Sequence, residues 1–426
     1  MSRVVVIGAG AMGLAAGYYA AKRGHSVTVL EAAPEPGGMA AHFDLGGLSI
    51  ERYYHFVCKA DRATFDLLAD LGLAGKMRWV PTSMGYYVDG TLHRWGDPVA
   101  LLKFPKLSPV EKLRYGAMMF LSTRRSDWRS LENVSAKDWI TAWCGASVYE
   151  RLWAPLFRLK FYEFADNISA AWIWTRIKRL GTSRRSMMQE ELGHIEGGSE
   201  TLIHALVAAI ERKGGRVVLN APAEKIETAG GRVTGVRAGG TLYPADAVIS
   251  TVPTPLVARL APDLPAADLA RYAAIRNIGV VCVVFRLKRS VTPHFWINIT
   301  DKRFDIPGIV EFSNLRATGD TVVYIPYYMP VTQPKFARDD AYFRSEAFGY
   351  LKLLNPQLRD DDLIACYVGR LRHAQPVCPP GFLAMLPPVE TAIGGLQIAD
   401  TCFYYPEDRG ISESVRFGKM MAERVP

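Results

Sequence analysis

The chain has 426 residues, of which 49% are hydrophobic and 22% charged, with a formal net charge of +9. This composition is that of a globular protein and excludes a chain that is disordered as a whole. Its length allows two to three domains, and no stretch after the N-terminal one approaches the roughly 20 uncharged residues that cross a bilayer.

The six cysteines are scattered and form no CxxC pair, so we expect reduced thiols in a cytoplasmic protein, with no metal site and no disulfide framework. The positive charge would suit a nucleic acid, an anionic substrate or a membrane surface. No nucleic-acid module or long basic tail accompanies it, and we therefore expect no nucleic-acid partner. The sequence carries no signal of an oligomeric state.

The N-terminus predicts a strand over Val4 to Ile7, a helix that ends near Gly24 and a second strand over Val27 to Leu30. The uncharged run from Val4 to Ala21 could also be an export signal. Four glycines interrupt that run, however, and it leads into a strand instead of a cleavage site. The order strand, glycine turn, helix and strand is typical of a dinucleotide-binding unit.

The glycines of this turn have GxGxxG spacing, and each has a mechanical role. Gly8 would make the tight turn, Gly10 would let the backbone approach a pyrophosphate, and Gly13 would allow close packing of helix on strand. Phosphates would lie at the helix N-terminus, where free N–H groups and the dipole favour negative charge. Glu31 ends the second strand and is placed to bind an adenosine ribose.

Two unusual segments follow. Gly37 and Gly38 form a turn in which the backbone can lie close to a bulky group. The run from Ser49 to Val57 is predicted as a strand that carries several polar and aromatic side chains. Such a run is uncommon in the core of a sheet.

Eight of the nine tryptophans fall between residues 79 and 174. Within this segment, Ser108-Pro109-Val110-Glu111 predicts a helix start with a capping box. Apolar residues of this helix are flanked by lysines and arginines, which fits a helix in a membrane interface. The favoured alternative is a helix that packs on its own domain with solvated basic residues.

The chain then alternates again between helix and strand, with a helix from Ser199 to about Ile210, a small β-meander and a strand over Ala247 to Ser250. Beyond residue 275 we expect an antiparallel sheet with strands near residues 280–287, 295–299, 309–312, 321–327 and 363–372, and one helix over 340–353. The last segment predicts a strand that ends at the acid Asp400 and a final helix that begins near Ile411.

The N-terminal fingerprint, the block from Ala221 to Pro253 and this tail together resemble the FAD-dependent amine oxidase superfamily. Protoporphyrinogen-oxidase-like and phytoene-desaturase-like members are the most similar. The resemblance implies an α/β fold with an FAD-binding Rossmann-like domain of the glutathione-reductase type. An inserted α+β substrate domain would be built on an antiparallel sheet and helices. We expect the FAD domain at 1–80, 195–270 and 390–426, and the substrate domain at 81–194 and 271–389, with a helical part at 98–190.

The resemblance also implies which residues hold the cofactor. Gly8, Gly10 and Gly13, with the first helical residues Ala11 and Met12, would hold the FAD pyrophosphate, and Glu31 the adenosine ribose. The other implied contacts are Gly37, Gly38 and Met39 at the phosphate and ribityl chain, Ala223 at adenine, Asp400 at the ribityl and pyrophosphate oxygens, and Gly410 and Ile411 at the flavin ring. Many relatives have arginine where this chain has Met39.

The sequence departs from the family where relatives carry paired glycines beside the flavin ring, since Tyr53 and Tyr54 stand there. Tyr54 is therefore expected both to contact the ring and to take part in catalysis. His55 aligns with a histidine of several relatives and of UDP-galactopyranose mutases, and it is the leading candidate for a polar catalytic group. The alternative is a hydrogen-bonded core histidine. Tyr405 is a further catalytic candidate.

Glu407 and Asp408 lie between Asp400 and the final helix, and we expect both side chains to cap structure. The resemblance implies an FAD-dependent oxidoreductase that moves a hydride from a C–N or C–C unit of a small organic substrate to flavin N5. No second GxGxxG is present, so O2 or a quinone is the expected electron acceptor.

Two other hypotheses stay open. One is a redox-neutral isomerase or mutase for a sugar nucleotide or isoprenoid, supported by Tyr54, His55 and arginines such as Arg370, Arg372 and Arg409. The other is a non-catalytic flavoprotein at the membrane. A location in the cytoplasm, with peripheral contact at the inner face of the membrane, is compatible with each hypothesis.

Overall fold

The computed structural model describes all residues from 1 to 426. Its first layer is a five-stranded parallel sheet in the order β10-β2-β1-β14-β20. The strands are β1 (Arg3–Ile7), β2 (Ser26–Leu30), β10 (Arg216–Val218), β14 (Ala247–Ser250) and β20 (Leu396–Ile398). Because the strands are parallel, their carboxyl ends meet at one edge, although they come from both ends and the middle of the chain.

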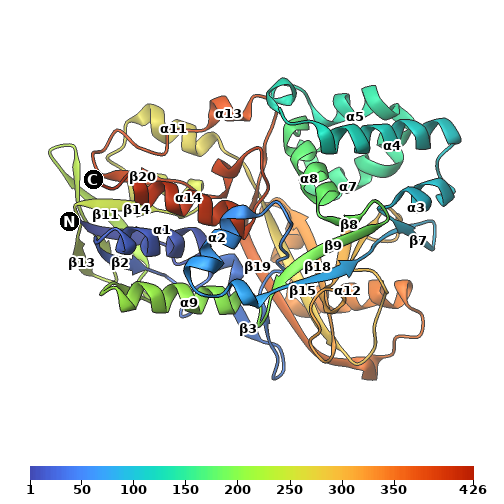
Figure 1. Ribbon diagram of the computed structural model, residues 1–426, viewed down its shortest axis with the longest axis horizontal. Helices are drawn as coiled ribbons and strands as arrows, with labels where there is room; N and C mark the ends of the chain where they lie inside the picture. Colours follow the sequence, from blue (N-terminus) through green and yellow to red (C-terminus); the bar gives the residue numbers. More distant parts are fainter.

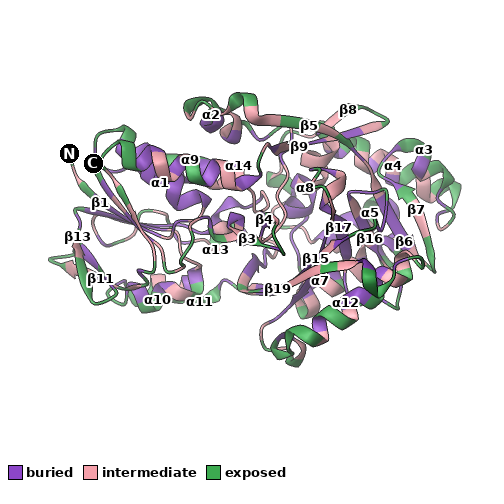
Figure 2. Ribbon diagram, turned by 90° about the horizontal axis from the view of Figure 1, so that it is seen from below, coloured by how far each residue is buried: buried purple, intermediate pink, exposed green.

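Helices cover one face of this sheet and a β-meander with short helices covers the other (Figure 1, Figure 2). The first group is α1 (Ala11–Lys22), α9 (Ser199–Arg212) and α14 (Ile411–Glu423). The second group is β11 (Ala223–Ala229), β12 (Arg232–Ala238), β13 (Thr241–Pro244), α10 (Val257–Leu260) and α11 (Ala266–Ala274). Burial from both sides explains why Val4 to Ile7 are all apolar and buried.

The second sheet has seven strands in the order β19-β15-β18-β17-β16-β6-β7, and all neighbours are antiparallel except β16 and β6. The strands are β6 (Met84–Val88), β7 (Thr91–Trp95), β15 (Asn277–Leu287), β16 (Trp296–Ile299), β17 (Gly308–Glu311), β18 (Thr321–Met329) and β19 (Leu363–Pro376). Helix α12 (Asp340–Leu354) packs on one face of this sheet.

A layer of helices lies beside the second sheet (Figure 1). Its members are α3 (Pro98–Lys103), α4 (Pro109–Arg124), α5 (Ala136–Cys144), α6 (Ala146–Val148), α7 (Ala154–Phe161) and α8 (Ala170–Thr182). The remaining elements are α2 (Arg62–Asp70), α13 (Phe382–Met385), the pair β3 (His42–Asp44) and β4 (Ser49–Glu51), and the sheet of β5 (Met77–Thr82), β9 (Gln189–Ile195) and β8 (Arg184–Ser186).

One hydrophobic core of 96 buried residues extends from the parallel sheet into the second sheet and the helical layer. A separate core of 22 buried residues lies between the second sheet and α12. The larger core joins the two halves of the molecule, so groups that face one another between them are held by a common packing.

The predicted α/β architecture, with a parallel sheet, a meander and a mainly antiparallel second sheet, is confirmed. The capping box at Ser108 is present as predicted, with Ser108 and Glu111 bonded to each other's backbone. The division into an FAD domain and a substrate domain at the boundaries given above stays a prediction.

Candidate active site

The turn between β1 and α1 needs glycine at two positions. Gly8 has a φ of +99°, and a Cβ there would lie 2.7 Å from the Thr251 hydroxyl oxygen. A Cβ at Gly13 would lie 1.9 Å from the Gly8 carbonyl oxygen. Helix α1 therefore begins directly against the turn, and the N–H groups of Ala11, Met12 and Gly13 have no acceptor within the helix.

Gly10 lies on the open side of this turn. No atom lies within 4 Å of the position that its Cβ would take, and no side chain caps α1. The paired glycines reach the same place: the Gly37 N–H donates to the Ala9 carbonyl at 2.8 Å, and a Cβ at Gly38 would lie 3.2 Å from the Gly10 Cα. Met39 follows in a short turn. The two glycine segments thus meet at the free end of α1, an anion-binding position.

Glu31 turns its carboxylate back towards the same loop. Its Oε2 accepts a hydrogen bond from the Ala9 N–H at 2.7 Å, and its Oε1 accepts one from the Ala33 N–H at 2.9 Å. The Glu31 carbonyl accepts from the Ala221 N–H at 2.8 Å, which brings Ala223, at the start of β11, close to it. Carboxylate oxygens keep further lone pairs for an incoming hydroxyl group. The residues predicted at ribose and adenine are therefore neighbours.

Helix α14 runs beside α1 in the same direction (Figure 1). A Cβ at Gly418 would lie 2.5 Å from the Met12 carbonyl oxygen, so the two backbones touch. Since an α-helix rises 1.5 Å per residue, Ile411 extends about 6 Å beyond the start of α1. Gly410 precedes α14 and makes no side-chain cap, so the first N–H groups of α14 are also free of side-chain partners.

Asp400 lies at the carboxyl end of β20. Its Oδ2 accepts from the Thr254 N–H at 2.6 Å and its Oδ1 from the Cys402 N–H at 2.8 Å. Because β14 separates β1 from β20, Asp400 lies two strands from Gly8, about 10 Å along the same sheet edge. The opening turn and the closing helix thus flank one edge of the parallel sheet.

The predicted strand from Ser49 to Val57 is wrong, because β4 ends at Glu51. Its partner β3 is only three residues long, and the Glu51 carboxylate turns inward to Arg316 Nη2 at 2.9 Å. The Tyr324 hydroxyl also donates to the Glu51 carbonyl at 2.6 Å, and the chain pairs again only at Val57, opposite Gly193. Residues 52–56 therefore form a loop that is fixed at both ends.

This loop places Tyr53, Tyr54 and His55 deep in the protein. Tyr54 packs edge-on against Trp296 and Tyr324, with ring centroids 5.7 Å apart in both pairs. Burial raises the pKa of the Tyr53 and Tyr54 hydroxyls and lowers the pKa of His55 to about 4. His55 is therefore neutral at pH 7.

The same three side chains keep some accessible surface. Accessible surface at such depth borders an internal space. The Tyr53 hydroxyl and the His55 Nδ1 are buried and have no hydrogen-bond partner, and buried polar groups without partners call for a ligand or water. The loop therefore holds two buried polar atoms that find no partner within the protein.

Four charged side chains lie behind Tyr54, namely Lys160 of α7, Arg176 of α8, Asp408 and Arg409. Asp408 forms an ion pair with Arg176, and its Oδ1 lies 3.9 Å from Arg409 Nε. Arg409 also donates to the Ala374 carbonyl of β19. We found no spacing or motif in the sequence that points to Lys160 or Arg176. The only local hint is that Trp172 and Arg176 share a helix face, where the guanidinium lies 4.8 Å from the indole.

Tyr405 occupies a different place from Tyr54 and His55. Its hydroxyl hydrogen-bonds Ser169 Oγ at 2.7 Å and the Glu132 carboxylate, and its ring packs against Phe382 at 5.2 Å. No contact joins Tyr405 to Tyr54 or His55. These bonds tie the segment before α14 to the helical layer.

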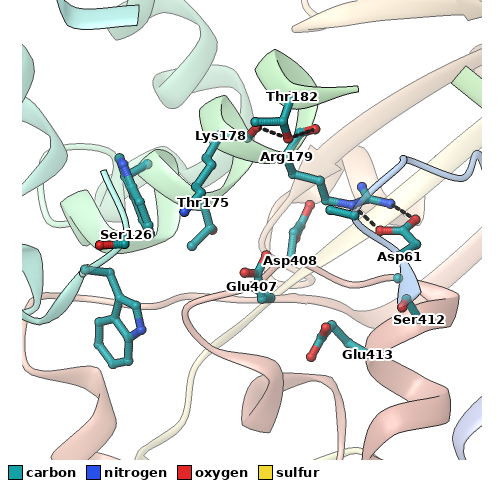
Figure 3. Close-up of a pocket in the computed structure, with 14 residues that line it drawn as sticks. Asp61, Ser126, Thr175, Lys178, Arg179, Thr182, Glu407, Asp408, Ser412 and Glu413 are labelled. Atoms are coloured by element: carbon teal, nitrogen blue, oxygen red, sulfur yellow. Dashed lines mark hydrogen bonds and ion pairs between the residues drawn. The ribbon is translucent and has the colours of Figure 1, made fainter. Parts of the chain in front are cut away.

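The expectation that Glu407 and Asp408 cap structure is wrong. Helix α14 begins after Gly410 without a side-chain cap, and Asp408 pairs with Arg176. Glu407 lines a cavity of about 230 Å³ between α8 and the start of α14 (Figure 3), and its carboxylate has no bonded partner. Burial, and then the neighbouring Glu413, raises the pKa of Glu407 to about 7.

The bidentate pair of Arg179 and Asp61 closes one side of this cavity (Figure 3), with distances of 2.7 and 3.0 Å. The other lining residues are Ala60, Ser126, Trp128, Trp174, Thr175, Lys178, Thr182, Asp408, Gly410, Ser412 and Glu413. The cavity therefore borders the N-terminal end of α14 on the side of the helical layer.

Comparison with known proteins assigns the family of the chain and shows that others share its fold. The profile described as flavin containing amine oxidoreductase matches residues 13–338. The chain belongs to this family. Its members are flavin-dependent oxidoreductases, and this flavoenzyme therefore combines a parallel dinucleotide-binding sheet with a second, mainly antiparallel sheet.

Solved structures show the same fold over the whole flavoenzyme. A structure from Exiguobacterium sp. 255-15, provisionally named protoporphyrinogen oxidase, is 20% identical with a TM-score of 0.75, covering 99% of this chain and 98% of that one. Cyclohexylamine oxidase from Brevibacterium oxydans IH-35A is 18% identical with a TM-score of 0.73, covering 100% of this chain and 98% of that one.

Among curated sequences, hydroxysqualene dehydroxylase from Rhodopseudomonas palustris is 27% identical over 294 residues, which are 65% of this chain and 68% of that protein. The chain spans about half the length of the first curated relatives that it matches. These relatives act on chemically different molecules by their names, so similarity assigns the family and the fold, not a substrate.

Proposed function

We propose that the protein binds FAD and catalyses hydride transfer from a C–N or C–C unit of a small organic substrate to flavin N5. The observation that carries this proposal is the shared sheet edge of Gly10 and Asp400, flanked by the free N-termini of α1 and α14. The N-termini of these two parallel helices are offset by about 6 Å along the helix axes. Such an offset suits an elongated anionic cofactor, with phosphates at one end and a ring at the other.

The residues present fit such a cofactor. The open side of Gly10 leaves room for phosphate. At the ring end, the Tyr53 hydroxyl and His55 Nδ1 have no hydrogen-bond partner within the protein. We assign the phosphates to Gly8, Gly10, Ala11, Met12, Gly13, Gly37, Gly38 and Met39, the ribose to Glu31, adenine to Ala223, the ribityl chain to Asp400, and the ring to Tyr54, Gly410 and Ile411. The dipole of α14 would stabilise negative charge on the ring.

When bound, the flavin supplies the redox chemistry, and the protein supplies position, electrostatics and exclusion of water. His55 is neutral because burial lowers its pKa to about 4, so one of its nitrogens can accept a proton or a hydrogen bond. Tyr54 keeps its proton because burial raises its pKa, and it can donate a hydrogen bond to the substrate. We propose O2 or a quinone as the electron acceptor.

A redox-neutral isomerase or mutase is the second candidate, and His55 favours it. The arginines that would hold a diphosphate give it less support, because Arg370 pairs with Asp340 at 2.5 Å on the surface and Arg372 is exposed. Of the three arginines that the sequence suggested for a diphosphate, only Arg409 lies near the site. A non-catalytic flavoprotein does not fit a chain of an oxidoreductase family.

The test uses Gly10, where an added side chain should interfere with phosphate binding and leave the folding of the protein unchanged. The extended backbone of Gly10 accepts any residue, so Gly10→Glu should fold but repel the pyrophosphate and lose FAD. Gly75→Glu is the matched control, since no atom lies within 4 Å of its Cβ position either. The flavin absorbance of the purified proteins is the measurement. The proposal fails if the wild-type protein shows no flavin band after incubation with FAD, or if Gly10→Glu binds FAD normally.

We further propose a peripheral contact between helices α3 and α4 and the cytoplasmic face of a membrane. None of the helices has the length and apolarity to cross a bilayer. Helix α4 buries Tyr115 and Met118 in its own domain, yet its opposite side is apolar and exposed, with Leu113 74% accessible. The exposed apolar residues of the two helices are Val99, Leu102, Val110, Leu113, Phe120 and Leu121.

Cations at Lys103, Arg114 and Arg124 surround this surface, a combination that suits anionic lipid head groups. The FAD-loaded protein should sediment with phosphatidylglycerol-containing vesicles and less with pure phosphatidylcholine. Leu113→Glu combined with Leu121→Glu should abolish sedimentation. Leu353→Glu on α12, which changes an equally apolar exposed residue elsewhere, should not. Equal sedimentation of the double variant and the wild type would refute the contact.

A further inference from the structure

The ammonium group of Lys160 has no partner of opposite charge. It lies 5.1 Å from the centroid of Trp172 and 4.9 Å from that of Tyr328, and it makes no hydrogen bond or ion pair with the protein. Lys160 is half-buried, and burial lowers its pKa well below the ordinary value. Aromatic faces attract a cation but do not neutralise it.

The charges around Lys160 do not balance. Lys160, Arg176 and Arg409 face a single carboxylate, Asp408, which both arginines already approach. Burial alone would raise the pKa of Asp408, but the three surrounding cations hold it below its ordinary range. With all four groups ionised, the cluster carries an excess of two positive charges in a region of low dielectric, an expensive arrangement without a counter-ion.

Loss of a proton from Lys160 would not remove this excess, because two arginines would still face one carboxylate, and arginine stays protonated in proteins. A bound anion would remove it. One oxygen of Asp408 and the Nε of Arg409 are also buried without a hydrogen-bond partner, so polar atoms in the cluster are left for a ligand or its water.

The cluster lies near the predicted catalytic loop. Burial raises the pKa of the Tyr54 hydroxyl, and the nearby guanidinium groups of Arg176 and Arg409 act in the opposite direction. Trp172 and Tyr328 supply aromatic faces beside Lys160. A ligand here would meet an apolar surface and a positive end together.

From this arrangement we infer that the substrate carries a carboxylate or phosphate group, which Lys160 and Arg409 bind while its apolar part lies against Tyr54. The inference rests on the proposed function, since it names the substrate class of that site. The same positive cluster repels a protonated amine, so a cationic amine is the wrong substrate for this chain although the family is named for amines.

Three small aromatic probes of similar shape test the inference: benzoate, benzamide and benzylamine at pH 7. The FAD-loaded protein is titrated with each, and binding is followed by flavin absorbance and by calorimetry. Benzoate should bind about tenfold more tightly than benzamide, because a charge-assisted contact replaces a neutral one, and benzylamine should bind most weakly. Equal affinities for benzoate and benzamide would overturn the inference.

Lys160→Met keeps the length and apolar packing of the side chain and should lose about tenfold in benzoate affinity, with benzamide unchanged. Lys160→Arg should restore benzoate binding. Lys178→Met is the matched control, since Lys178 also lies over an indole, 4.9 Å from Trp174, but donates to the Arg125 carbonyl at 2.7 Å. Benzoate binding that is the same in wild type and Lys160→Met would overturn the inference.

The outcome is separable from that of the proposed function. If the protein takes up no FAD, the proposed function fails, and calorimetry of the flavin-free protein with benzoate still tests the positive cluster. If the protein takes up FAD and the probes do not discriminate by charge, only the substrate class is wrong.

Discussion

Replacing Glu407 by Gln should stabilise the protein at neutral pH and not at acidic pH. Its carboxyl group lines the cavity beside α14 without a bonded partner, and its pKa rises from 4.5 to about 7. Well below pH 4.5 the carboxyl group is protonated in both the folded and the unfolded chain, so it does not affect their balance. As the pH rises from 4.5 to 7, the unfolded chain ionises first, and the free energy of unfolding falls.

The magnitude follows from the pKa difference, since one unit corresponds to about 1.4 kcal/mol. A rise from 4.5 to about 7 gives at most about 3.5 kcal/mol, and access of water from the cavity reduces that value. Glu407→Gln removes the ionisation, so the variant should match the wild type at pH 4.5 and exceed it by roughly 2 to 3 kcal/mol at pH 8.

Urea unfolding of the FAD-loaded protein between pH 4.5 and 8 measures this difference. Glu311, which lies elsewhere and also has a raised pKa of about 7, contributes equally to both proteins and cancels. Glu423→Gln is the control, because Glu423 ends the same helix α14 but is exposed and lies outside the cavity. A stability difference between Glu407→Gln and wild type that does not change with pH would refute the reasoning.

Three further substitutions test other parts of the site. Tyr405→Phe should cost about 1 to 2 kcal/mol of stability, because Glu132 loses its phenol partner, and kcat and KM should stay unchanged. Lost turnover at unchanged stability would instead make Tyr405 catalytic. Gly418→Val should destabilise the protein by about 1 to 3 kcal/mol and weaken FAD binding, because the valine side chain would collide with the Met12 backbone. Thermal unfolding with and without FAD measures both effects. His55→Phe should lower kcat about 100-fold with FAD still bound, whereas unchanged kcat would identify a core histidine.

The half of the fold around the parallel sheet was predictable because its signals are local. The glycine spacing from Gly8 to Gly13 and the acid at Glu31 lie within one strand-helix-strand unit, and each residue has a steric or hydrogen-bonding reason that does not depend on distant contacts. The structure adds that Gly418 is required for the contact of α14 with α1. That requirement was not visible, because it joins residues about 400 positions apart.

The ring end of the site could not be derived in the same way, since long-range contacts decide it. Residues 49–57 have the composition of a strand, but the strand ends at Glu51. That residue is bonded to Arg316, in the connection between β17 and β18, and to Tyr324 of β18. Tyr405 lies closer in sequence to the final helix than Asp400 does, yet its hydroxyl is bound to the helical layer at Ser169. Proximity in sequence to a motif therefore did not predict which side chains face the site.

Substrate choice in such a flavoenzyme depends on side chains that no motif marks. The family profile assigns the chain to a flavin-containing family and the shared fold assigns its architecture, but both are compatible with relatives named for an amine and for a hydroxylated hydrocarbon. Charge balance around Tyr54 depends on side chains from α7, α8 and the segment before α14 together. A cationic substrate would add to the two unmatched positive charges there, and an anionic one would offset them. The discrimination between benzoate and benzylamine therefore reports on a specificity that the similarity to known proteins does not contain.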